Sequence, residues 1–71
     1  MFKEQIREEL EVMLLTLRNI DKEITTLKVT AHTLEKLMLD TTEVYKLIDT
    51  LSVEWLNLYR GFNKMVSEQL Y

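Results

Sequence analysis

Residues 39–44, with the sequence Leu-Asp-Thr-Thr-Glu-Val, interrupt an otherwise regular helical pattern in this 71-residue chain. Asp40 is a favoured residue at the start of a helix, because its side chain can accept a hydrogen bond from an amide of the first turn. Glu43 has the spacing of a capping box, and apolar residues flank the pair as a hydrophobic staple. We therefore predict a turn at residues 39–40 and a second helix that begins near Thr41.

The sequence before this turn carries one long apolar seam. Apolar residues recur there at alternating intervals of four and three residues, a heptad pattern typical of a coiled-coil-like helix. The pattern predicts a helix over about residues 3–38, roughly 54 Å long at 1.5 Å per residue. The seam consists of Ile6, Leu10, Met13, Leu17, Ile20, Ile24, Leu27, Ala31, Leu34 and Met38.

The sequence after the turn repeats the same spacing and predicts a helix over about residues 41–68. Two long helices with a tight connection become antiparallel neighbours. We therefore predict an all-α fold, a long antiparallel helical hairpin of two helices that forms a single domain over residues 1–71. The second seam consists of Val44, Ile48, Leu51, Trp55, Leu58, Phe62 and Met65.

A run of β-branched residues at 25–33 suggests an alternative with three helices, because such residues have poor helix propensity. The heptad phase crosses this run without a slip, and no Gly or Pro marks a turn in it. The pattern therefore favours one continuous first helix.

The apolar surface is wider than two helices need, because further apolar residues flank both seams. A chain this small usually needs a disulfide, a metal or a partner for stability, and it has no Cys and one His. We predict that two hairpins pair into a four-helix bundle, with a homotetramer or a heteromeric bundle as alternatives. The expected oligomer core is Leu10, Leu17, Ile24, Leu27, Leu34, Ile48, Leu51, Trp55, Leu58 and Phe62.

Three tyrosines flank the second seam and are candidates for a partner surface, because Tyr is enriched at interface hot spots. They are Tyr45, Tyr59 and Tyr71. Trp55 lies on the seam itself, so we interpret it as a core residue.

The chain shows no set of residues for catalysis or metal binding. Its serines and its histidine form no nucleophile arrangement, and no Gly-rich turn could supply an oxyanion hole. A di-iron helix would need Glu three residues before His32, and the residue there is Val29. We expect no enzyme activity and no cofactor or metal.

Charge and hydropathy bound the remaining classes of function. The formal net charge is −3 with both signs interspersed, which gives no strong attraction for nucleic acid or acidic membranes. The sequence lacks the 18 or so consecutive apolar residues of a membrane span, and its N-terminus lacks the apolar core of a signal peptide. We expect a cytoplasmic protein that does not enter a membrane.

These observations predict a non-catalytic protein-interaction or scaffold module that acts as a homo-oligomer, with a dimer favoured and a separate protein partner as an option. The alternative is a small dimeric nucleic-acid-binding regulator, in which Arg18, Arg60 and Lys64 contact phosphates. The predicted shape resembles that of small helical-hairpin dimers that bind structured RNA, an analogy of fold alone.

Overall fold

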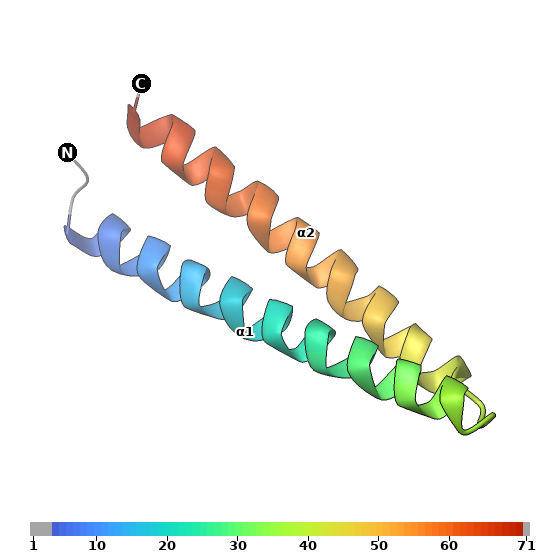
Figure 1. The fold of residues 1–71 in the computed structure, drawn as a ribbon. Coiled ribbons are helices and arrows are strands. Elements are labelled where there is room, and N and C mark those ends of the chain that lie inside the picture. Colours follow the sequence, from blue (N-terminus) through green and yellow to red (C-terminus); the bar gives the residue numbers. More distant parts are fainter. Residues whose placement is uncertain (1–3, 71) are drawn as a thin grey trace.

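A computed structural model describes residues 4–70, with side chains described up to residue 68. It contains two helices, α1 (Glu4–Lys36) and α2 (Thr42–Leu70). The helices run antiparallel, so that the start of α1 and the end of α2 lie at the same end of the molecule (Figure 1). The described residues contain no strand. The prediction of an all-α fold with two helices is confirmed.

The threonine-rich part of α1 is helical throughout, so the alternative with three helices is wrong. Four Thr hydroxyls in this stretch each donate a hydrogen bond to the carbonyl oxygen four residues earlier, at 3.0 Å. Such bonds satisfy the side chain on the helix itself. They explain how α1 accommodates residues of low helix propensity. The four are Thr25, Thr26, Thr30 and Thr33.

The end of α1 is a Schellman motif, a feature that the sequence pattern did not predict. Met38 has a positive φ of 57°. Its amide donates to the carbonyl of Glu35 at 3.0 Å, and the amide of Leu39 donates to the carbonyl of Leu34 at 2.9 Å. These two bonds satisfy carbonyls that the helix end leaves free. The helix therefore ends at Lys36 and not at the predicted residue 38.

Replacing Met38 with Gly is expected to stabilise the protein by about 1 kcal/mol, because a left-handed conformation is unfavourable for an L-residue and not for Gly. Denaturant unfolding at one fixed protein concentration measures the gain. Met38→Ala is the matched control and should give no such gain, since Ala has the same steric cost. A loss of stability in Met38→Gly would contradict the assigned conformation.

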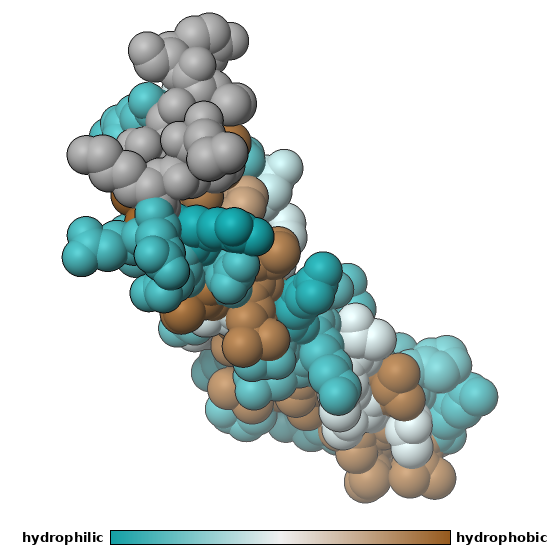
Figure 2. Space-filling model, turned by 90° about the vertical axis from the view of Figure 1, so that its left-hand side faces the viewer, coloured by the Kyte–Doolittle hydropathy of each residue, from teal (hydrophilic) through white to brown (hydrophobic). Residues whose placement is uncertain are grey.

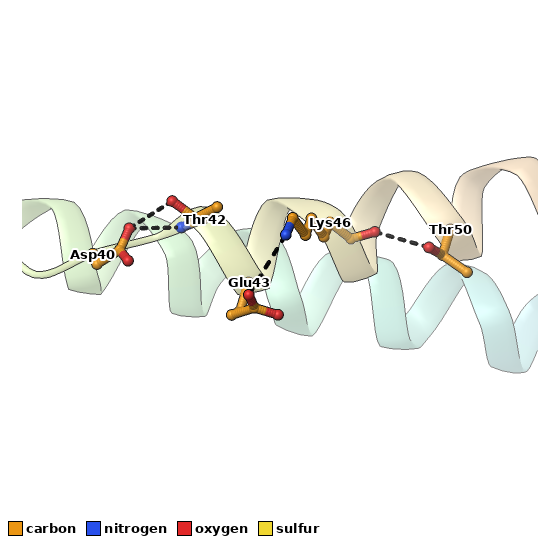
Figure 3. A network of polar contacts seen from close by, with 5 residues as sticks. All are labelled: Asp40, Thr42, Glu43, Lys46 and Thr50. Carbon is orange, nitrogen blue, oxygen red and sulfur yellow. Dashed lines mark hydrogen bonds and ion pairs between the residues drawn. The ribbon is translucent and has the colours of Figure 1, made fainter.

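The start of α2 is organised by Asp40, as Figure 3 shows. A carboxylate oxygen of Asp40 accepts hydrogen bonds from the amide of Thr42 at 3.0 Å and from its hydroxyl at 2.7 Å. The first backbone bond of α2 runs from the amide of Tyr45 to the carbonyl of Thr41 at 3.0 Å. The helix thus begins at Thr42, one residue after the predicted start, and it continues to Leu70, beyond the predicted end at 68. Glu43 lies 3.7 Å from the ammonium of Lys46.

The cap makes the stability of α2 depend on pH. The pKa of Asp40 lies below its ordinary value, mainly because its carboxylate accepts a hydrogen bond from the Thr42 hydroxyl. The hydrogen bond from the Thr42 amide is the next largest cause. The carboxylate therefore contributes stability above its unfolded pKa of about 3.9, and this contribution is lost as the pH falls through the lower folded pKa. The difference in melting temperature between wild type and Asp40→Asn should shrink below about pH 4. A difference that stays constant down to pH ~2 would contradict this role.

The hairpin is elongated and exposes much surface for its mass. Its radius of gyration is 16.2 Å, against about 11 Å for a compact domain of this length. Its Cα trace extends over 53 × 15 × 12 Å. The accessible surface is 5951 Å², roughly 1,300 Å² more than the ~4,650 Å² of a typical folded monomer of 8.5 kDa. An isolated hairpin therefore leaves far more surface in water than a folded monomer normally does.

Candidate self-association surface

Only one of the two apolar rows in each seam lies directly between the helices. On α1 the buried residues recur at intervals of seven. In a heptad pattern this spacing places them in one straight row along the helix. On α2 the buried residue is Ile48. The buried row of α1 consists of Leu10, Leu17, Ile24 and Ala31.

The second row of each helix stays half-buried, and the two second rows together form what we call the open face. In heptad geometry each residue of a second row is rotated by about 50° about the helix axis from the row that faces the other helix of the hairpin. All nine residues are apolar and all nine are half-exposed to solvent. The open face consists of Ile6, Met13, Ile20, Leu27 and Leu34 on α1 with Val44, Leu51, Leu58 and Met65 on α2.

Local contacts place both rows of the open face on the same side of the hairpin. Leu27 and Leu51 line one depression of about 490 Å³, together with Lys22, Glu23, Thr26, Leu47 and Thr50. Closer to the chain ends, a Cβ added to Gly61 would lie 3.6 Å from the terminal methyl of Met13. The first observation brings a residue of each row to one side of the hairpin, and the second places Met13 of the α1 row against α2.

The opposite side of the hairpin, which we call the polar side, carries mixed chemistry. On α1 the corresponding row contains charged residues, namely Arg7, Asp21, Lys28 and Glu35, together with Leu14. On α2 it contains Tyr45, Ser52, Tyr59 and Val66. The two sides of the same hairpin thus differ sharply, because the open face has no charged residue in either row.

Tyr45 links the two helices on the polar side. Its hydroxyl donates a hydrogen bond to the carboxylate of Glu35. The same bond raises the pKa of Tyr45, because only the protonated hydroxyl can donate it to Glu35. The ring is exposed, but its polar group is already used within the hairpin. A partner that bound Tyr45 would meet mainly its ring.

Further along α2, Tyr59 of the polar side lies against Trp55, which belongs to the same heptad row as Ile48. The rings of Trp55 and Tyr59 stack with centroids 4.9 Å apart and an interplanar angle of 14°. They line a small pocket of about 250 Å³, just below the 300–1,000 Å³ range of common ligand sites. Arg18 and Asp21 flank it, so the basic group predicted to contact phosphate lies beside an acidic one.

The predicted site residues therefore fall into distinct places. Within the predicted oligomer core, Leu10, Leu17, Ile24 and Ile48 are buried inside the hairpin, and Leu27, Leu34, Leu51, Trp55, Leu58 and Phe62 are half-buried. Tyr59 is exposed, and Tyr71 lies outside the described residues. Arg18, Arg60, Lys64 and His32 are exposed.

The connection between the helices presents a further apolar surface that the sequence analysis did not identify. Met38 is 95% exposed, and its neighbours Leu37 and Leu39 are also exposed. Figure 2 shows hydrophobic side chains, in brown, reaching the surface along the molecule and at its lower end, where Figure 1 places the connection. The signal in the sequence was three consecutive apolar residues just before a helix cap.

The chain matches no protein-family model, no curated protein and no solved structure. Over the described part of the chain, neither helix has a segment both long and apolar enough to cross a bilayer. Within residues 4–70, His, Asp and Glu side chains form no group of three that could hold a metal ion.

Proposed function

We propose that this chain is a non-catalytic protein-interaction module that works as a homo-oligomer, with two hairpins joined through their open faces into a four-helix bundle. The observation that carries the proposal is the open face itself, a continuous double row of nine apolar residues that the hairpin leaves only half-buried, with no charge in either row. Large exposed apolar surfaces on small proteins mark sites of association.

The size of the exposed surface supports a permanent association. A standard interface buries about 800 Å² on each partner, and obligate dimers bury more. The excess of roughly 1,300 Å² over a typical monomer falls in this second range. The open face is also apolar in the way that obligate homodimer interfaces are. Such an interface resembles a domain core divided between two chains.

A second copy of the chain is the occupant that the chemistry favours. A face that is apolar along its whole length is complementary to itself when a two-fold axis brings two copies together. The polar side offers a poorer surface, since pairing it with a copy would bury charged residues at Arg7, Asp21 and Lys28.

Sedimentation velocity tests the proposal directly. At micromolar concentration the protein should sediment with at least twice its chain mass of 8.5 kDa. It should also show the high helical content of the hairpin by circular dichroism. A fully helical species of one chain mass at these concentrations would refute the proposal.

The rival function is nucleic-acid binding by the same dimer, supported by exposed Arg18, Arg60 and Lys64. Phosphate contacts of this kind would give an affinity that falls steeply as salt increases. A gel-shift assay with duplex and structured RNA at low salt distinguishes the two functions. Retardation that disappears with added salt favours the rival, and none at low salt removes it.

A further inference from the structure

Two arrangements could join the open faces of two copies, and they differ in the direction of the second hairpin. The two-fold axis can run along the bundle, which puts both helix connections at the same end and packs α1 of each copy against α2 of the other. It can instead lie across the bundle, which puts the connections at opposite ends. In that case α1 packs against α1 and α2 against α2.

The residues at the outer margin of the open face distinguish these arrangements. Residues that flank the core of a helical bundle set the partner and its orientation through charge. On α1 the margin residues nearest the second copy are Glu9, Thr16, Glu23 and Thr30, and on α2 they are Leu47, Glu54, Gly61 and Glu68. Glu23 and Leu47 line the depression on the open face, where Lys22 is also present, and a side chain added at Gly61 would meet Met13 of that face.

With both connections at the same end, like charges face one another. An axis along the bundle keeps every residue at its own height, so α1 meets α2 of the second copy in the register of the hairpin. The hairpin register, in which Tyr45 bonds Glu35 and Met13 lies beside Gly61, then places Glu23 at about the height of Glu54 of the second copy. Two heptads toward the chain ends, Glu9 lies nearly opposite Glu68. The symmetry repeats both repulsive pairs.

With the connections at opposite ends and the helices fully overlapped, these pairs disappear. Antiparallel α1 helices place Glu23 opposite Thr16 of the second copy, and Glu9 opposite Thr30. Antiparallel α2 helices place Glu54 opposite Gly61 of the second copy, and Glu68 opposite Leu47. Every margin carboxylate then faces an uncharged residue, while the nine apolar residues still meet in the core.

We propose that two copies of this chain pair through their open faces with the helix connections at opposite ends, so that α1 contacts α1 and α2 contacts α2. This inference rests on the proposed dimer and specifies its geometry. Removing four like-charge contacts favours this orientation by roughly tenfold, given the strength of single helix-surface charge pairs.

Spin labels and pulsed dipolar spectroscopy test the orientation. The chain has no Cys, so a single introduced Cys takes one label per copy. The variant Lys36→Cys places it at the exposed last residue of α1, beside the connection. Opposite orientation predicts a main separation near the 53 Å length of the hairpin. A same-end arrangement predicts less than about 30 Å, the width of a four-helix bundle with its labels.

The variant Asn57→Cys is the matched control, because this exposed position near the middle of α2 gives a short separation in either orientation. A long distance for the label at position 36 with a short one at position 57 supports the inference. Short distances at both positions overturn it and leave the proposed dimer intact. No dipolar coupling at either position shows that the chain does not pair, and then both the inference and the proposed function fail.

Discussion

Replacing Leu17 with Asp is expected to abolish the folded hairpin. Leu17 is 5% exposed and belongs to the row that faces α2, so an aspartate there would lose water without gaining a partner. The loss of the apolar contacts alone costs about 2–5 kcal/mol at a buried Leu, and the unpaired carboxylate adds to it. This total is comparable to the whole stability of many small domains. The helical circular dichroism signal at 25 °C should therefore be lost.

The matched control is Leu15→Asp, the same change two residues away on the outer surface of α1. Leu15 is 59% exposed, and surface substitutions usually change stability by less than about 0.5 kcal/mol. Its melting curve should lie close to that of the wild type. If both variants melted alike, the assignment of the buried row would be wrong.

Placing two lysines on the open face is expected to separate the dimer. The double variant Ile20→Lys with Leu58→Lys changes one half-buried residue on each helix at the same height of the hairpin. Pairing would bury four ammonium groups in an apolar interface, which is costly. The dissociation constant should rise at least ~100-fold, equivalent to about 3 kcal/mol. Sedimentation velocity over a concentration series measures this shift.

The control for this prediction carries the same two charges on the outer surface. Leu15→Lys with Leu56→Lys alters two exposed apolar residues away from both faces of contact. It should keep the mass of the wild-type assembly. An open-face variant that sediments like this control would show that the chain associates through another surface.

The sequence predicted the two helices and their antiparallel arrangement, because both depend on strong local signals. Alternating intervals of four and three continue through each helix, and Asp40 accepts the expected hydrogen bond from an amide at the start of α2. Leu17 and Ile48, which this periodicity assigns to the apolar seams, are buried between the two helices of the hairpin.

The end of α1 could not be predicted in the same way. A Schellman motif usually has Gly in its left-handed position, and here that position is occupied by Met38. The local sequence therefore looked like a continuing helix.

The division between the open face and the polar side depends on how the two helices face one another. The heptad pattern of one helix does not show which of its two apolar rows the other helix covers, nor which row stays at the edge of the hairpin. The depression that Leu27 and Leu51 both line, and the hydrogen bond between Tyr45 and Glu35, provide that information. Once the hairpin register is known, heptad phase assigns every other residue to a side.

The short connection between the helices also shapes how the chain folds. Tyr45 and Glu35 are only ten residues apart, whereas Met13 and Gly61 meet from distant parts of the chain. Closing a small loop costs less entropy than closing a large one. Refolding should therefore start beside the connection, and the contacts between the two helices should then form progressively toward the two chain ends. Substitutions near the connection should slow refolding, while those near the ends should mainly accelerate unfolding.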